Sequence, residues 1–338
     1  MRTLLVLLAL PLHALASQPA GTVVTSNMQD HTATLLDART GASLATLPTG
    51  QGPHEVAVSH DGRWALVSNY GPREAPGNTI TVIDVAARAV ARTIDLGDVR
   101  RPHGVSFLPG DSAFVVTSEA SRAVLLVDFR DGRVLRSLPS AGRATHMLGV
   151  SADGRRAVTA NIADATISVL DLRGGDGART IAVARQPEGI ALAPDGSRAW
   201  VGSNKVSVVL VVGTDRGAVV DTVRGFALPY RIAISADGRT ALVTDPARGE
   251  VRAFDAATHA PRFTVTFTRD SLVPTAEVPG SPSPEGAVIS PDGRWAFVTL
   301  QGRDRVAAID LARGRVAWYG VTGAWSDGIG YSPLAARR

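Results

Sequence analysis

One pattern recurs along this chain at nearly constant spacing, and it limits the fold more than any other feature. Each copy contains a polar or aromatic residue, a short apolar stretch, an Asp-Gly turn or a variant of it, and a second apolar stretch. The copies cover residues 53–69, 102–118, 145–161, 187–203, 229–245 and 284–300, and a truncated copy covers 326–333. Their starts lie 49, 43, 42, 42, 55 and 42 residues apart. A period of about 40 to 50 residues with short strands is typical of β-propellers.

Each repeat unit contains enough alternating apolar segments for four strands. In the first full unit these are 55–59, 64–68, 79–84 and 90–96, and the Asp61-Gly62 turn joins the first two. Residues 21–47 supply the last three strands of a further unit, and residues 326–333 supply its missing inner strand. We therefore predict an all-β, seven-bladed β-propeller with four antiparallel strands per blade. N-terminal strands pair with a C-terminal inner strand to close the ring, which removes the free sheet edges.

The first 16 residues do not fit the repeat and are typical of a secretory signal peptide. Arg2 precedes an apolar run at 4–12, and Ala14-Leu15-Ala16 has the small-x-small form of a cleavage site. We expect cleavage after Ala16, a periplasmic or secreted protein, and a single propeller domain at 17–338. The apolar run is too short to span a bilayer, so no transmembrane segment is predicted.

Composition excludes several classes of function. The chain has no cysteine, so it has no disulfide, no thiolate nucleophile and no c-type haem attachment. Its 35 basic and 31 acidic residues are interleaved along the sequence and give a net charge of +4. Because this pattern forms no focused basic patch, we expect no nucleic acid partner.

The repeat resembles that of the YVTN-repeat seven-bladed propellers over essentially all of the chain after residue 16. The copy at 284–300, PEGAVISPDGRWAFVTL, carries the pattern clearly. Relatives of this kind include surface-layer proteins, a periplasmic DNA-binding propeller, the haem d1 domain of nitrite reductase and amine dehydrogenase heavy chains. The segment VSNYG at 67–71 is also similar to the 6-phosphogluconolactonase-like propellers. The resemblance implies the fold, and it leaves a lactonase-like hydrolase open as an activity.

The residue just before each inner strand is expected at one face of the propeller, where the seven blades meet. We call these residues the ring residues: His54, His103, His146, Glu188, Tyr230, Glu285 and Asp327. Three consecutive blades supply histidine, which suits Zn, Cu, Fe or Ni. His54, His103 and His146 are thus candidate ligands of a divalent transition metal, with Glu188 or Glu285 completing the shell. The alternatives are purely structural histidines and a haem ligand role for one of them.

The same face offers acid–base chemistry without a metal. A histidine that faces Glu188 or Glu285 could act as a general base, and His146 and Glu188 are the candidates. Arg143, Arg185 or Arg231 could polarise a carbonyl. The ring residues and the residues that end the second strands are expected to surround the propeller axis as a polar opening, which we call the funnel. The residues expected to line it for a ligand are Asn69, Asn161, Asn204, Tyr230, Asp245 and Asp327. Two long loops, 70–78 and 269–283, are expected to cap this face.

These residues favour a periplasmic propeller that binds a ligand or a metal in a His- and Glu-lined funnel. We expect its partner to be a small molecule or a metal, and we expect the protein to be a monomer. A lactonase-like hydrolase that uses the same funnel is one alternative. A scaffold that binds a protein partner is the other.

Overall fold

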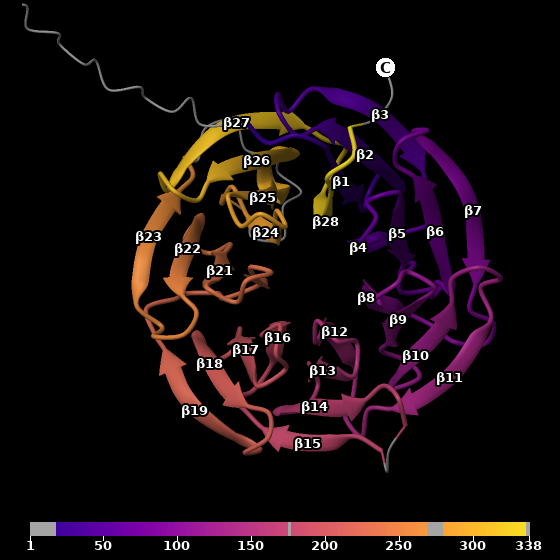
Figure 1. The fold of residues 1–338 in the computed structure, drawn as a ribbon, viewed down its shortest axis with the longest axis vertical. Helices are drawn as coiled ribbons and strands as arrows, with labels where there is room; N and C mark the ends of the chain where they lie inside the picture. Colours follow the sequence, from indigo (N-terminus) through magenta and orange to yellow (C-terminus); the bar gives the residue numbers. More distant parts are fainter. Residues whose placement is uncertain (1–17, 175–176, 269–279, 336–338) are drawn as a thin grey trace, which may run out of the picture.

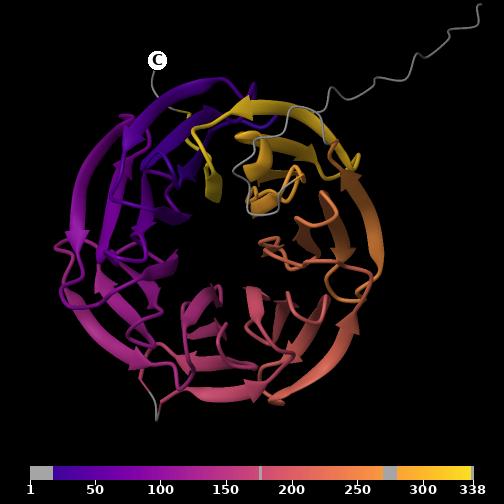
Figure 2. The same ribbon diagram turned by 180° about the vertical axis from the view of Figure 1, so that it is seen from behind.

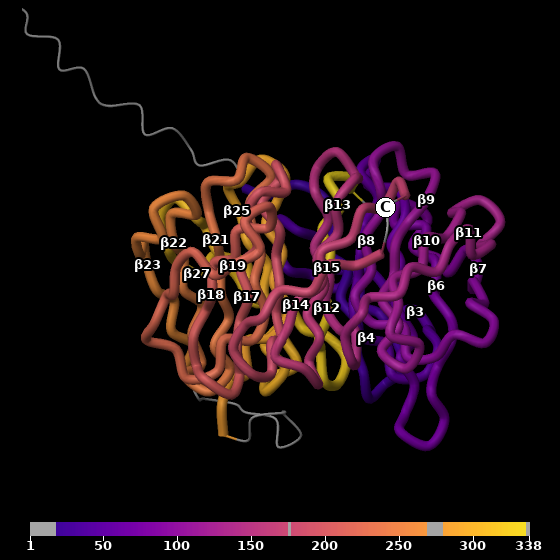
Figure 3. Tube along the Cα trace, turned by 90° about the horizontal axis from the view of Figure 1, so that it is seen from below, coloured from indigo at the N-terminus to yellow at the C-terminus, as the bar shows by residue number. Residues whose placement is uncertain are grey.

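A computed structural model of the chain describes residues 18–174, 177–268 and 280–335. The predicted signal peptide at 1–16 lies outside the described residues, and so does most of the predicted capping loop 269–283. The described residues form seven four-stranded antiparallel sheets around one axis, which confirms the seven-bladed propeller (Figure 1). Seen edge-on, the ring is a thick disc whose two faces carry the loops between strands (Figure 3). Among the described residues, no helix is long and apolar enough to cross a membrane.

Six blades are continuous in sequence, and each runs from an inner strand near the axis to an outer strand at the perimeter. Blade 1 contains β4 (Pro53–Val58), β5 (Trp64–Asn69), β6 (Thr79–Asp84) and β7 (Ala89–Asp95). Blade 2 contains β8 (Pro102–Phe107), β9 (Ala113–Ser118), β10 (Ala123–Asp128) and β11 (Val134–Pro139). Blade 3 contains β12 (Thr145–Val150), β13 (Arg156–Asn161), β14 (Thr166–Asp171) and β15 (Arg179–Ala182).

The remaining continuous blades follow the same order. Blade 4 contains β16 (Pro187–Leu192), β17 (Arg198–Ser203), β18 (Val208–Gly213) and β19 (Ala218–Val223). Blade 5 contains β20 (Ile232–Ile234), β21 (Thr240–Asp245), β22 (Glu250–Asp255) and β23 (Pro261–Thr266). Blade 6 contains β24 (Pro284–Ile289), β25 (Trp295–Leu300), the 3-10 turn η1 (Gln301–Arg303), β26 (Arg305–Asp310) and β27 (Arg315–Val321).

The closing blade is built from both ends of the chain, as the sequence predicts. It contains β28 (Ser326–Ser332), β1 (Thr22–Asn27), β2 (Thr32–Asp37) and β3 (Ser43–Pro48). Antiparallel pairing sets Thr22 opposite Ser332, and the C-terminal β28 lies beside β1 in both face views (Figures 1 and 2). The two ends therefore close the ring by backbone hydrogen bonds.

The hydrophobic core is divided into seven clusters, one at each interface between adjacent blades. The sequence predicts that Trp64, Trp200 and Trp295 pack between blades, and each lies in or against one of these clusters. Trp200, for example, is buried in blade 4 and its ring centroid lies 6.0 Å from that of Phe254 in blade 5. Because each sheet buries both faces, the blades stabilise one another.

Polar clamps at the outer strands add to this packing. In four blades, the outer-strand residue that pairs with the fourth residue of the third strand donates from its side chain to a backbone carbonyl of the next blade. Arg136 donates to the carbonyl oxygen of Leu172 at 3.2 Å, and Trp318 Nε1 donates to that of Ala38 at 3.0 Å. Equivalent bonds join Arg92 to Phe129 and Arg179 to Thr214.

Candidate functional site

Local structure explains why the ring residues converge at one face. In five blades a β-bulge follows the first residue of the inner strand, as between Pro53 and Val56. A bulge re-aims the side chains beside it. In addition, a hydroxyl near the end of a second strand donates to the carbonyl oxygen of a ring residue in the next blade. Thr299 does so to Asp327 at 2.9 Å, and Thr117 binds the carbonyl of His146.

Glycine directly follows several ring residues, because the next blade's backbone approaches it closely. A Cβ on Gly189 would lie 2.2 Å from the carbonyl oxygen of Tyr230, and one on Gly286 would lie 2.2 Å from that of Asp327. A residue with a Cβ would therefore clash with the next blade, and glycine allows the two backbones to approach so that adjacent ring residues meet. This explains the glycine of the Pro-x-Gly sequence that begins several inner strands.

His146 lies at the centre of the converged residues, with a carboxylate on each ring nitrogen. Its Nδ1 contacts Glu119 Oε1, and its Nε2 lies 2.6 Å from Glu188 Oε1. Burial alone would lower the pKa of His146, but the charges of Glu188 and Glu119 and their hydrogen bonds raise it to about 10. His146 is therefore an imidazolium at neutral pH in the metal-free protein.

Arg231 extends this chain of charges across the funnel. Its Nη1 donates to Glu188 Oε1 at 2.9 Å, and its Nη2 donates to Glu55 Oε1 at 2.7 Å. Glu188 and Arg231 are each only 4% exposed. Burial would raise the pKa of Glu188, but the charges of His146 and Arg231 hold it at about 2. Because Glu55 belongs to blade 1 and Arg231 to blade 5, the pair ties non-adjacent blades together.

An aromatic group continues the cluster on the other side of His146. The His103 ring centroid lies 3.8 Å from that of His146, and His54 stacks on Tyr70 at 4.6 Å. The Tyr70 hydroxyl donates to Glu119 Oε2 at 2.5 Å, so Glu119 links Tyr70 to His146. Burial lowers the pKa of His54 to about 4 and that of His103 well below its ordinary value, so both rings are neutral.

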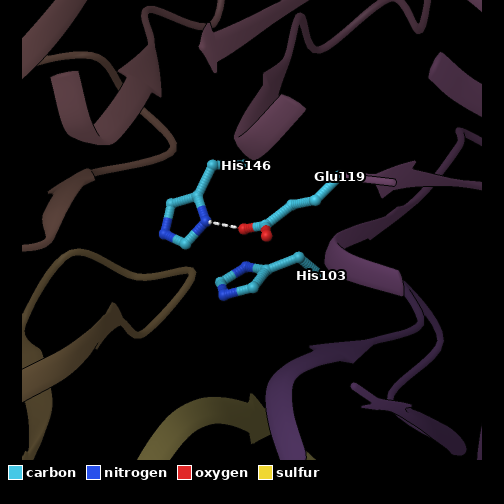
Figure 4. A group of neighbouring side chains, drawn as sticks. All are labelled: His103, Glu119 and His146. Atoms are coloured by element: carbon cyan, nitrogen blue, oxygen red, sulfur yellow. Dashed lines mark hydrogen bonds and ion pairs between the residues drawn. The ribbon is translucent and has the colours of Figure 1, made fainter. Parts of the chain in front are cut away.

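His103, Glu119 and His146 form a group that could hold a metal ion. One ligand atom from each lies within 4.8 Å of the others, and the side chains converge from neighbouring blades (Figure 4). His103 is 1% exposed, and its Nδ1 has no hydrogen-bond partner among the described residues. A buried nitrogen of this kind is costly without a partner, and a metal ion would supply one.

The structure brings several of the sequence-predicted site residues together. His146, Glu188 and Arg231 form one hydrogen-bonded chain, and His103 packs against it. His54 lies beside the group formed by His103, Glu119 and His146 and is not part of it. Glu285 and Asp327 are buried at their ring positions, and the Glu285 carboxylate accepts a hydrogen bond from Ser283 at 2.7 Å.

Other predicted residues lie elsewhere. Arg185 is exposed on the loop before β16, and Arg143 is exposed and pairs with Asp164. Asn69, Asn161 and Asp245 are buried at the ends of second strands. Asn69 and Asn161 bind Thr and Ser hydroxyls of their own third strands, and Asp245 accepts hydrogen bonds from the loop before β20. Asn204 and Tyr230 are half-buried at the same face; Tyr230 lies under the Arg231 guanidinium at 4.6 Å.

Sequence reasoning missed Glu119, Glu55 and the role of Tyr70. Glu119 and Tyr70 each come one residue after a second strand, just beyond the strand-end positions that we selected in the sequence. Glu55 and Arg231 occupy the position after the ring residue, where four blades have glycine. Two opposite charges at a position that holds glycine in four blades and Met147 in the remaining one were the available signal for their ion pair.

The fold and site together define a seven-bladed propeller with a buried His- and Glu-rich cluster at one end of its axis. The chain belongs to the cytochrome D1 heme domain family, whose model matches residues 12–224. The family accounts for the propeller and its YVTN-like repeat. The closer resemblances to periplasmic YVTN propellers and to lactonases remain predictions.

Two solved structures illustrate the likeness. Hydrazine synthase of Kuenenia stuttgartiensis superposes with a TM-score of 0.70 at 19% identity, over 89% of this chain and 98% of that chain. A functionally unknown protein from Desulfotomaculum acetoxidans DSM 771 superposes with a TM-score of 0.74 at 14% identity, over 93% and 99%. At these identities the likeness shows the fold alone. No curated protein matches the chain.

The family name implies a haem, and the ring histidines can be tested against that group. An axial ligand needs a nitrogen that faces a cavity large enough for the macrocycle. Both nitrogens of His146 contact carboxylates, and His103 is fully buried. His54 borders a pocket whose described lining residues include no Arg or Lys to pair with the carboxylates of a haem. These residues do not fit a haem, and we derive no chemistry through one.

Proposed function

We propose that this protein is an exported metal-binding propeller that holds one divalent transition metal at His103, Glu119 and His146. The observation that carries the proposal is the convergence of these three side chains, with ligand atoms within 4.8 Å of one another. Two imidazoles and one carboxylate are a ligand set that binds zinc and leaves a fourth position for water or a ligand. Imidazole also suits Cu, Fe and Ni, so the ligand types define a class of metal.

The surroundings of His146 support this assignment. Metal-bound histidines commonly donate their second ring N–H to a carboxylate, which fixes the ring and strengthens the ligand. Glu188 lies 2.6 Å from His146 Nε2 and is itself held by Arg231 at 2.9 Å. Nδ1 then faces Glu119, where a metal ion would take the place of the proton. Metal binding at this nitrogen therefore releases a proton.

The charge balance of the cluster also favours a cation. Three carboxylates contact the two cations Arg231 and His146: Glu55, Glu119 and Glu188. Charge in a low-dielectric interior is costly unless it has partners of opposite sign. A divalent ion in place of the His146 proton would add one positive charge beside Glu119. Export is proposed from the signal-peptide pattern at 1–16.

The test is the metal content of the mature protein, purified without chelator or polyhistidine tag and measured by elemental analysis. We expect about one equivalent of a transition metal per chain in the unaltered protein. His103→Ala, Glu119→Gln and His146→Ala should lose most of it, while Glu188→Gln should weaken binding by roughly 10- to 100-fold.

Two controls make this test specific. His60→Ala removes an imidazole that binds Asp111 outside the funnel and should leave the metal content unchanged. His54→Ala distinguishes the proposed ligand set, His103, Glu119 and His146, from the three histidines suggested by the sequence. If His54→Ala loses the metal while Glu119→Gln keeps it, the assigned ligand set is wrong. If the unaltered protein takes up no metal even after reconstitution, the proposal fails.

A further inference from the structure

A second site lies at the rim of the funnel, between the closing blade and blade 1. A cavity of about 470 Å³ is present there, bordered by Met28, His31, Gly52, His54, Pro72 and Trp325. This volume lies within the range of about 300–1,000 Å³ that is typical of small-molecule sites. The cavity does not include His103, Glu119 or His146 among its described lining residues, so it is distinct from the metal-binding group.

One peptide group determines the tautomers of both histidines in this cavity. The Gly52 N–H donates to His31 Nδ1 at 3.1 Å, so that nitrogen carries no proton. The Gly52 carbonyl oxygen lies 3.1 Å from His54 Nδ1 and can only accept, so that nitrogen must carry the proton. In the neutral rings His31 Nε2 is therefore a donor and His54 Nε2 an acceptor.

Apart from the amide of Gln29, the other side chains of the cavity are mainly apolar. Met28, Pro72 and Trp325 contribute a thioether, a pyrrolidine ring and an indole, and the described lining residues include no Asp, Glu, Lys or Arg. An ionic ligand would lose its hydration here without gaining a charged partner. Indole and thioether groups pack well against flat, polarisable rings.

We propose that this pocket binds an uncharged, planar small molecule that accepts a hydrogen bond from His31 Nε2–H and donates one to His54 Nε2. Lactams and related heterocycles, which carry N–H and C=O groups together, are the chemical class with this pattern. The pocket is not a second metal site, because a metal shared by both rings needs a lone pair on each Nε2. That would place a proton on His31 Nδ1 against the Gly52 N–H.

The first experiment measures the tautomers directly. Nitrogen-15 NMR of histidine-labelled, chelator-treated protein should show His31 protonated at Nε2 and His54 protonated at Nδ1. The same protein is then titrated with 2-quinolone, a planar, uncharged bicyclic lactam, and with 1-methyl-2-quinolone, which lacks the N–H donor. We expect 2-quinolone to bind and the methylated compound to bind roughly three- to tenfold more weakly, as for loss of one hydrogen bond.

Variants locate the binding. His31→Leu removes the exposed donor and should weaken 2-quinolone binding by a similar factor, while His60→Leu, outside the funnel, should not change it. Because the protein is metal-free, these results do not depend on the proposed metal site. The proposal is overturned if 2-quinolone does not bind at millimolar concentration, if both compounds bind equally, or if His31 is protonated at Nδ1.

Discussion

His146 has a carboxylate on each ring nitrogen, and neither carboxylate comes from its own blade. Glu119 follows the second strand of blade 2, and Glu188 begins the inner strand of blade 4. Its neighbour His103, in van der Waals contact with it, has a pKa shifted in the opposite direction. Two identical residues thus differ in charge because one has buried acidic partners and the other does not.

These shifts predict how the stability of the metal-free protein depends on pH. The pKa of His146 is raised from 6.5 to about 10, so its contribution is complete below pH 6.5 and is lost as the pH rises through 10. The pKa of His54 is lowered to about 4, so its contribution is complete above pH 6.5 and is lost as the pH falls toward 4. Urea denaturation of chelator-treated protein should give the highest free energy of unfolding near pH 6.5. A free energy that keeps rising from pH 6.5 to 9 would contradict the charge state of His146.

Glu188→Gln should lower the pKa of His146. Removing one of two carboxylate charges at hydrogen-bond distance should reduce it by roughly 1 to 3 units. The measurement is a pH titration of the His146 ring by NMR in metal-free protein, with circular dichroism to confirm that the variant folds. Asp164→Asn, at an exposed ion pair with Arg143, is the matched control and should leave the value unchanged.

At the scale of strands, hydrogen bonds from one blade to the next recur at equivalent strand positions in several blades. Outer-strand side chains in blades 1, 2, 3 and 6 donate to a carbonyl of the following blade, and second-strand hydroxyls hold the ring residues. Because these directional bonds lie beside the apolar clusters of the interfaces, they help to set the register between blades as well as adding stability. Repetition of one unit therefore repeats its contacts around the ring.

Loss of one such clamp should have a moderate cost. Arg136→Met keeps much of the side-chain length and removes the bond to the carbonyl oxygen of Leu172. We expect the free energy of unfolding to fall by about 1–2 kcal/mol, as for a partly buried hydrogen bond from a charged donor. Urea denaturation measures this, and Arg130→Met, at an exposed turn residue, should change it by less than about 0.5 kcal/mol.

At the scale of the whole molecule, closure of the ring links the two ends of the chain. β28 is almost fully buried and pairs with β1 along most of its length, so the C-terminal strand completes both the closing blade and the Asp327 ring position. The Glu55–Arg231 pair adds a second long-range tie across the funnel. An open ring would expose an edge of β1 and the apolar faces that adjoin it.

Removal of residues 326–338 should therefore abolish cooperative folding. We expect loss of a single sharp thermal transition and association in size-exclusion chromatography, because a buried inner strand and two blade interfaces are lost together. Removal of 336–338 alone is the control and should leave both measurements unchanged. A monomeric, cooperatively melting protein without β28 would show that closure is not required.

The sequence by itself determined the number of blades, the strands within each blade and the way in which the ends meet. These features follow from local periodicity and turn residues, which repeat along the chain and depend little on distant contacts. It also placed His103, His146, Glu188 and Arg231 at or next to the ring positions, because equivalent positions in a repeat face the axis. The tertiary structure alone decided that Glu119 joins His103 and His146, that Glu55 pairs with Arg231 across the funnel, and that Asn69 and Asn161 bind within their blades. The Glu119–His146 and Glu55–Arg231 contacts join different blades, so their distances depend on the closed ring and cannot be derived from the repeat alone. The partners of Asn69 and Asn161 depend on side-chain orientations that the repeat does not specify.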